Sequence, residues 1–250
     1  MLLLATDLDG TFLAGQNLHK QKLYSIIRER NDIRLIFVTG RGLETVIPVL
    51  DDEEIPRPEY IICDVGATIV NGDTLKPILP LQTYIEDIWP GGVYVHNKIK
   101  EVKGLYPQEV PQSRRCSYYY NDDTDFTHLN EIARSVNCDV IKSAGKYVDI
   151  LPHGINKGYS LKQLINLLNI PAEYILVAGD TLNDLSLYKT GYKGVVVGDA
   201  EKNLLEATKN MDHVYHANKP GCGGILESLE HFREFRKFFP ESLRFTNSSL

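Results

Sequence analysis

Uninterrupted apolar runs and segments of helical periodicity alternate along most of the chain. An apolar run without polar interruption is typical of a strand buried on both faces, and such runs lie at residues 2–6, 33–38, 60–63, 174–178, 194–197 and 213–215. Helical spacing predicts helices at residues 20–30, 42–50, 157–168, 185–189, 201–209 and 221–239. This order predicts an α/β fold, a doubly wound parallel sheet with a Rossmann-like core.

The alternation is interrupted in the middle of the chain. Asn71-Gly72 between two short apolar runs predicts a hairpin, and Pro80 marks an exit from the first domain. The following segment predicts a helix at 81–89, strands at 93–96, 116–120, 139–141 and 147–150, and a helix at 126–136. We therefore expect an inserted α+β domain at residues 81–151 and a core made of residues 1–80 and 152–250, with a loose tail after residue 240.

Polar side chains follow three of the predicted strands at their carboxyl ends. Asp7 and Asp9 follow the first strand, Thr39-Gly40-Arg41 follows the second, and Asp180 follows a later one. Ligands of open parallel sheets collect at this edge, and Gly10 lets the chain turn there without a Cβ clash. Two carboxylates that face one small volume repel each other, so the pattern predicts a bound cation.

Several polar residues at helix starts have both a structural and a functional interpretation. Lys157 lies in the first turn of a helix that Asn156 caps, where the helix dipole disfavours a lysine, so a role outside the helix is indicated. Asn183 and Asp184 begin another helix and are suited to capping it. Thr39 has the same ambiguity, since it is placed to cap the helix that follows it.

Charge and composition narrow the class of partner. The 250 residues carry 27 basic and 33 acidic side chains, a formal charge of -6 at pH 7, which argues against binding nucleic acid or an anionic membrane through a basic face. The four cysteines include no Cys-x-x-Cys pair and suggest neither a zinc site nor a disulfide framework. Without a signal-peptide pattern or an apolar run of membrane-spanning length, we expect a cytoplasmic protein with small-molecule partners.

Four segments together resemble the motifs of the haloacid-dehalogenase superfamily of phosphohydrolases: Asp7-Leu8-Asp9-Gly10-Thr11, Val38-Thr39-Gly40-Arg41, Asn156-Lys157-Gly158 and Gly179-Asp180-Thr181-Leu182-Asn183-Asp184. The insert lies between the third strand and the lysine segment, where it is similar to the larger cap domain of that superfamily's sugar phosphatases. Residues 65–66, 145–152 and 223–227 are similar to the sucrose-phosphate phosphatases.

The resemblance implies a role for each motif residue. Asp7 would be the nucleophile, and Asp9 would be the general acid and base. The implied cofactor is Mg²⁺, with the metal ligands Asp7, Asp9 through its carbonyl, Asp180 and Asp184. The phosphoryl oxygens would be held by Thr39, Gly40, Lys157 and Asn183.

The insert is expected to recognise the sugar, because groups that bind only phosphate cannot distinguish leaving groups. The candidates for binding the substrate are Arg41, Lys146 and Asp149. Lys146 and Asp149 could bond sugar hydroxyls as a charged pair, or form a surface or hinge salt bridge. Tyr118-Tyr119-Tyr120 is suited either to sugar stacking or to packing.

The resemblance implies a Mg²⁺-dependent phosphomonoesterase that acts on sucrose 6-phosphate or a related glycosyl sugar phosphate through an aspartyl phosphate. A sugar phosphomutase and a broad-specificity hexose-phosphate phosphatase remain alternatives, because similar caps occur with the same motifs. A phosphate-accepting receiver module is disfavoured by the length and the insert, and a catalytically silent partner of a glycosyltransferase by the intact motifs. An active enzyme could still associate with the glycosyltransferase that makes its substrate.

Overall fold

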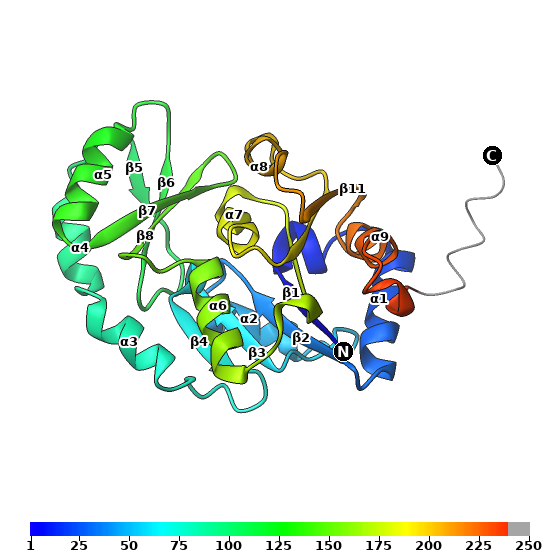
Figure 1. Ribbon diagram of the computed structural model, residues 1–250. Helices are drawn as coiled ribbons and strands as arrows, with labels where there is room; N and C mark the ends of the chain where they lie inside the picture. The colour runs from blue at the N-terminus through cyan, green and yellow to red at the C-terminus, as the bar shows by residue number, and fades with distance from the viewer. Residues whose placement is uncertain (240–250) are drawn as a thin grey trace.

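Two β-sheets organise the chain, which a computed structural model describes over residues 1–239 (Figure 1). The larger sheet has the strand order β11-β10-β9-β1-β2-β3-β4. Its strands are β1 (Leu2–Thr6), β2 (Ile33–Val38), β3 (Tyr60–Cys63), β4 (Thr68–Asn71), β9 (Ile175–Gly179), β10 (Lys193–Gly198) and β11 (Val214–Pro220). Neighbouring strands are parallel except β3 and β4. The predicted parallel α/β core is therefore confirmed, while the tail expected after residue 240 falls outside the described residues.

The strand order reverses at β1, which lies between β9 and β2. Every residue of β1 is buried, in agreement with its uninterrupted apolar sequence. In open parallel sheets the crevice outside the strand ends at such a reversal is the usual place for a ligand. The carboxyl ends of β1, β2 and β9 therefore face one site.

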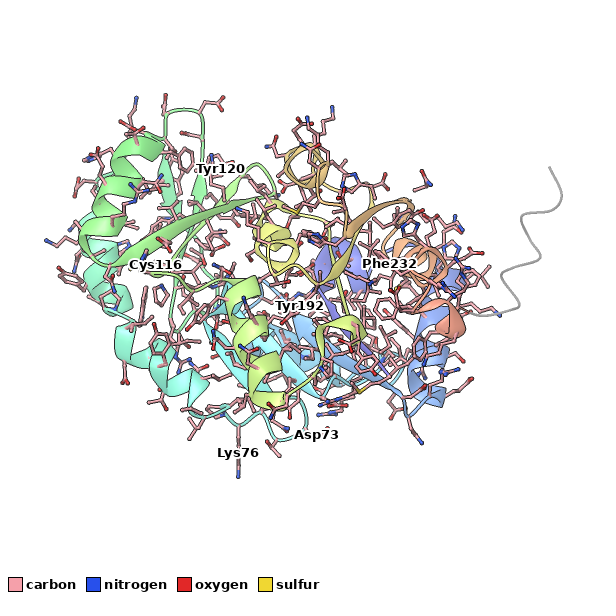
Figure 2. The ribbon with its side chains drawn as sticks, in the orientation of Figure 1. Asp73, Lys76, Cys116, Tyr120, Tyr192 and Phe232 are labelled. Carbon is pink, nitrogen blue, oxygen red and sulfur yellow. The ribbon has the colours of Figure 1, made fainter. Side chains whose placement is uncertain are left out.

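Helices cover both faces of the larger sheet. On one face lie α1 (Asn17–Glu29), α2 (Leu43–Leu50) and α9 (Cys222–His231), and on the other α3 (Leu81–Ile88), α6 (Lys157–Leu168), α7 (Leu185–Tyr188) and α8 (Lys202–Thr208). Successive residues of β1 point to opposite faces, so Leu4 joins one core and Leu3 the other. Figure 2 labels Phe232 of the first core and Tyr192 of the second. No helix among residues 1–239 is long and apolar enough to cross a lipid bilayer.

The smaller sheet comes from the middle of the chain and is antiparallel, in the order β5-β6-β8-β7. Its strands are β5 (Leu105–Pro107), β6 (Cys116–Tyr120), β7 (Cys138–Ser143) and β8 (Tyr147–Pro152), and one face is covered by α4 (Gly92–Ile99) and α5 (Phe126–Ser135). Cys116, labelled in Figure 2, belongs to this third core. The opposite face, which carries Tyr147 and Asp149, lines a cavity shared with the larger sheet. The domain boundaries at residues 81 and 151 stay predictions, and α3 packs on the larger sheet through Ile85.

Two elements of the insert region differ from the sequence-based expectation. Residues 93–96 were expected to form a strand but lie in helix α4, because Val95 and Ile99, four residues apart, bury one helical face in the third core. The turn expected at Asn71-Gly72 is present, because the Asn71 amide donates to the Lys76 carbonyl at 2.9 Å and Val70 bridges Pro77 in the antiparallel sense. The Asn71 side chain accepts hydrogen bonds from the Asp73 and Thr74 amides in this turn, and β4 also pairs along its length with β3. Strand β5 lies in a segment that was expected to be loop.

Two predictions about helix ends were wrong as well. Helix α9 was expected to continue to residue 239 but ends at His231, because Phe232 has an extended backbone. Phe235 and Phe238 then reach the core from the turns that follow. Thr39 does not cap α2, whose N-cap is Gly42. The Thr39 hydroxyl instead accepts a hydrogen bond from the Arg41 amide at 3.1 Å.

Candidate active site

Three carboxylates meet where β1 and β9 end. Asp7 follows β1 and Asp180 follows β9, and the Asp7 amide donates to the Ala178 carbonyl at 2.9 Å. Asp184 comes from the turn between β9 and α7. One oxygen of each carboxylate lies within 4.8 Å of the others. A set of carboxylate oxygens is the chemistry that Mg²⁺ prefers in proteins, so these residues fit the predicted metal.

The turn after β1 is shaped to hold Asp180. Gly10 has φ +77°, and a Cβ atom at this position would overlap the Asp180 carboxylate. Thr11 donates from its hydroxyl to Asp180 Oδ1 at 2.9 Å. Gly10 is therefore required for both its conformation and its close approach. Thr11 was quoted in the first motif without a role, and here it orients a metal-ligand candidate.

Lys157 joins two of the three carboxylates. Its ammonium donates to Asp7 Oδ1 at 2.7 Å and to Asp184 Oδ1 at 2.6 Å, and its side chain is fully buried. The following residue, Gly158, packs so closely that a Cβ atom would overlap the Ser186 carbonyl. This contact brings the start of α6 against α7. The lysine that the helix dipole disfavours is therefore held by two buried ion pairs, as its unusual position indicated.

Asp184 both caps the turn in which it lies and forms an ion pair in the site. Its Oδ2 accepts hydrogen bonds from the Asp180 and Thr181 amides, each at 3.0 Å, and completes a capping box with Thr181. Its Oδ1 accepts from Lys157. The capping bonds hold the carboxylate in place for the ion pair.

The titration of these groups reflects their crowding. Burial raises the pKa of Asp7 well above its usual value, the charges of Asp184 and Asp180 add to the effect, and Lys157 opposes it. Burial and then Asp184 raise the pKa of Asp180 to about 7. Burial favours the neutral amine of Lys157, but Asp184 and Asp7 outweigh it and raise its pKa. The cluster therefore keeps one ammonium and favours an additional proton or cation.

Asp9 lies beside this cluster, and its carboxylate faces Arg41. Arg41 donates from Nε and Nη2 to the two Asp9 oxygens at 2.8 and 2.6 Å. The Asp9 side chain is 61% exposed and the Arg41 side chain 30% exposed. Hydrogen bonding to Asp9 raises the pKa of Arg41. The predicted acid and base is thus held at the open side of the site by a residue that was predicted to contact the substrate.

A cavity of about 290 Å³ reaches the cluster at Asp7. Its floor and rim include Asp7, Asp9, Gly40, Arg41 and Asn183 from the larger sheet. From the smaller sheet and its loops come Gln108, Val110, Pro111, Arg115, Ser143, Ala144, Tyr147 and Asp149. The cavity therefore joins candidate catalytic groups to the part of the chain that was expected to recognise a sugar.

A model of the sucrose-6F-phosphate phosphohydrolase family matches residues 1–233. The chain belongs to the sucrose-6F-phosphate phosphohydrolase family. Solved structures of haloacid-dehalogenase phosphatases share its fold.

Three relatives of this family member are informative. A glucosylglycerol-phosphate synthase from Pseudomonas anguilliseptica is 49% identical over 232 residues, which are 92% of this chain and 31% of the synthase. A mannosylfructose-phosphate phosphatase from Agrobacterium fabrum is 27% identical over 92% of this chain and 96% of its own length. The crystal structure of the sucrose-phosphatase from Synechocystis, in complex with sucrose and phosphate, has a TM-score of 0.82 at 26% identity, covering 92% of this chain and 97% of that one. The chain thus spans about a third of the synthase and nearly all of the two phosphatases.

The two candidate substrate-binding residues of the insert, Lys146 and Asp149, do not form the pair that was predicted. Lys146 is exposed, its ammonium lies 4.9 Å from the centre of the Tyr147 ring, and it is not among the residues that line the cavity. Asp149 is buried and lines the cavity, where Ser117 donates to it at 2.5 Å and Arg115 at 3.3 Å. The predicted charged pair is therefore wrong.

The tyrosine run divides between the two faces of the smaller sheet. Tyr118 is buried in the third core, and Tyr120 packs edge-on against Phe126. Tyr119 is exposed, with its ring 5.5 Å from that of Tyr147, a residue of the cavity wall. Packing accounts for two of the three, and Tyr119 alone lies on the side where a sugar could stack.

Arg115 is the site residue that sequence reasoning missed. It is 6% exposed and donates to the Gly40 carbonyl at 2.6 Å, close to the predicted phosphate-binding residues. It lies in a stretch with two prolines and no helix or strand pattern. An arginine in such a stretch is usually exposed, so nothing in the sequence singled it out.

Proposed function

We propose that this chain is a Mg²⁺-dependent phosphomonoesterase for a glycosyl phosphate, with sucrose 6-phosphate and glucosylglycerol phosphate as the leading candidates. The observation that carries the proposal is the buried cluster of Asp7, Asp180 and Asp184, bracketed by Lys157 and open to a cavity of about 290 Å³. Sucrose 6-phosphate is supported by the family. Glucosylglycerol phosphate is supported by the 49% identity to a segment of the synthase named for that compound.

In the proposed reaction, a carboxylate oxygen of Asp7 attacks phosphorus while the bond from phosphorus to the sugar oxygen breaks. The leaving oxygen keeps the electron pair of that bond and takes a proton from Asp9. Water then attacks the aspartyl phosphate, Asp9 accepts its proton, and inorganic phosphate leaves as the Asp7 carboxylate is restored. Lys157 bonds Oδ1 of Asp7, which leaves Oδ2 free for the attack.

Residues around Asp7 would hold the phosphoryl group. The Thr39 hydroxyl, the Gly40 amide, the Asn183 amide and Lys157 are the candidate donors, and hydrogen bonds aimed at developing charge are often the largest single contribution to catalysis. Mg²⁺ bound by Asp7, Asp180 and Asp184, with the Asp9 carbonyl, would neutralise charge as the anionic carboxylate approaches the phosphate dianion. Arg41 keeps the Asp9 carboxylate at the cavity until the sugar oxygen arrives.

The proposal also includes a partner. The segment of the glucosylglycerol-phosphate synthase that resembles this chain is 31% of a longer protein, which supports a link between a chain of this kind and the enzyme that forms a glycosyl phosphate. We infer that this chain receives its substrate from a glycosyltransferase that forms the glycosyl phosphate. Co-elution of the two purified proteins in size-exclusion chromatography would support association, whereas independent elution at micromolar concentration would contradict a stable complex.

The substrate is tested by measuring phosphate release from a panel with Mg²⁺ present: sucrose 6-phosphate, glucosylglycerol phosphate, mannosylfructose phosphate, glucose 6-phosphate and p-nitrophenyl phosphate. We expect the highest kcat/KM for a phosphorylated glycoside. Equal values for glucose 6-phosphate and the glycosides would indicate a broad-specificity hexose-phosphate phosphatase. Isomer formation without phosphate release would indicate a phosphomutase.

A further inference from the structure

The chain between β5 and β6 crosses the phosphate loop, which we define as residues 39–42. We call residues 108–115 the covering segment. A Cβ atom on Gly42 would lie 2.5 Å from the Pro111 carbonyl oxygen, so the segment touches the loop directly. Gln108, Val110, Pro111 and Arg115 of the segment also line the cavity. The covering segment is therefore a wall of the site and a neighbour of the loop that would bind phosphate.

Arg115 ends this segment with a buried guanidinium that contacts both parts of the protein. Its Nη1 donates to the Gly40 carbonyl at 2.6 Å and to Asp149 Oδ1 at 3.3 Å. Its Nε lies 3.1 Å from Asp64 Oδ1, although the two atoms are not aligned as a hydrogen bond. Gly40 and Asp64 belong to the larger sheet's side, and Asp149 lies on β8 of the smaller sheet. One arginine thus links two buried carboxylates and one loop carbonyl.

Asp64 contacts the same loop from the end of β3. It follows β3 with φ +51°, its amide donates to the Arg41 carbonyl at 2.8 Å, and its Oδ2 accepts from Thr68 at 2.7 Å. The next amide, that of Val65, donates to the Thr39 carbonyl at 3.1 Å. The phosphate loop is therefore held by Asp64 and Val65 on one side and by Arg115 on the other.

The bond from Arg115 fixes the peptide plane between Gly40 and Arg41. In that plane the Arg41 amide donates to Thr39 Oγ1 at 3.1 Å. A hydroxyl that already accepts this bond keeps its own proton free to donate. The same plane sets the start of the Arg41 side chain, which holds Asp9. The orientation of Thr39 and of Asp9 therefore depends on one peptide whose carbonyl is bonded by Arg115.

We propose that Arg115 is a positioning residue. It couples the packing of the smaller sheet against the larger one to the conformation of the phosphate loop. Resting on the proposed phosphatase function, this assigns to Arg115 a role in phosphate affinity without contact with phosphate. When the smaller sheet is packed against the larger one, Asp149 and Asp64 hold the guanidinium between them, and the guanidinium donates to the Gly40 carbonyl. If the sheet moves away, Arg115 stays with Asp149 and the loop loses its outer support.

The test uses Arg115→Lys, which keeps the charge but lacks the fork that reaches Gly40 and a carboxylate together. We expect the inhibition constant of inorganic phosphate and the KM for p-nitrophenyl phosphate both to rise by about tenfold, the size of one lost charge-assisted hydrogen bond. Neither probe carries a sugar. Arg114→Lys is the matched control, because Arg114 lies in the same segment but pairs with Glu86 and reaches Thr68, not the loop; its constants should stay within about twofold of wild type.

Asp64→Asn provides a second variant with a milder charge change, since Arg115 and Asp149 remain a neutral pair. It should raise the phosphate inhibition constant in the same direction, and the double variant with Arg115→Lys should lose about as much as Arg115→Lys alone. If the losses of phosphate affinity in the two single variants add in the double variant, Asp64 and Arg115 act independently and the proposal is overturned. A fall in thermal midpoint with unchanged phosphate constants would reduce Arg115 to a structural role and overturn the proposal.

Two further outcomes separate this inference from the proposed function. If Arg115→Lys lowers kcat/KM only for glycosyl phosphates and is inhibited normally by inorganic phosphate, Arg115 contacts the sugar. That result would overturn the positioning role. If the wild type hydrolyses no glycosyl phosphate, the proposed substrate class fails. Calorimetric titration of inorganic phosphate onto the Mg²⁺-loaded protein then still compares wild type with Arg115→Lys, and equal affinities would overturn the inference.

Discussion

Lys157→Met removes the only ammonium that the described residues place between Asp7 and Asp184. The methionine fills a similar volume, so the main change is electrostatic. The variant leaves three carboxylates within 4.8 Å of one another, with no ion pair to a lysine or arginine among residues 1–239. Removing one partner of a buried ion pair typically costs about 3–5 kcal/mol of stability. For a chain of this size that corresponds to a thermal midpoint lower by about 10 °C.

The loss should depend on pH and on Mg²⁺. Lys157 itself stays protonated between pH 5 and 8, because Asp184 and Asp7 raise its pKa despite its burial. The carboxylates therefore decide how the loss of stability changes with pH. Burial raises the pKa of Asp7 and brings that of Asp180 to about 7. At pH 5 protons replace the missing positive charge, so the variant should lose less stability than at pH 8. Saturating Mg²⁺ should also reduce the loss, because it supplies the missing charge.

Thermal unfolding of both proteins, followed by circular dichroism at pH 5 and pH 8 with Mg²⁺ or with chelator, tests this reasoning. The matched control is Lys162→Met, the same substitution at an exposed position of α6, which should change the midpoint by no more than about 2 °C. An equal loss for Lys157→Met under all four conditions would refute the electrostatic account. A loss no larger than that of the control would refute the importance of the buried ion pairs.

Three further predictions concern individual residues. Asp9→Asn should lower kcat/KM for a glycosyl phosphate by about 10²–10⁴-fold and much less for p-nitrophenyl phosphate, whose leaving group needs little protonation; equal losses would count against Asp9 as the acid. The Mg²⁺ concentration for half-maximal rate should rise as pH falls from 8 to 6, because a proton on Asp180, with its pKa of about 7, competes with the metal; Asp180→Ala should raise the requirement at both pH values and flatten this dependence, and a requirement that ignores both changes would exclude Asp180 as a ligand. Lys146→Ala should lower kcat/KM for a glycosyl phosphate about two- to fivefold by releasing Tyr147, with no effect on p-nitrophenyl phosphate; parallel losses would indicate a structural role.

The meeting of Asp7, Asp180 and Thr39 could be predicted because their positions follow from strand order. Each lies directly after a buried parallel strand, and such strands all end at one edge. Lys157 could be predicted for a different reason, since its place in the first turn of α6 conflicts with the helix dipole. In both cases the local sequence contains the physical cause.

The insert was harder to predict because its decisive contacts join distant residues. Lys146 lies in the turn before β8 and Asp149 lies within β8, so the two side chains do not share a face of the strand. Arg115 is buried only because Asp64 and Asp149 converge on it from two different sheets. Residues 93–96 are too few for their apolar spacing to distinguish a strand from a helix.

The central claim, that Asp7 carries out phosphoryl transfer from a glycosyl phosphate, is tested most directly by comparing wild type with Asp7→Asn. Inorganic phosphate released from the best glycosyl phosphate of the panel is measured with Mg²⁺ and with excess chelator. The account predicts turnover by the wild type with Mg²⁺ only, and none by Asp7→Asn at an unchanged thermal midpoint, because the amide keeps the shape but removes the nucleophile. Sustained turnover by purified Asp7→Asn would contradict it.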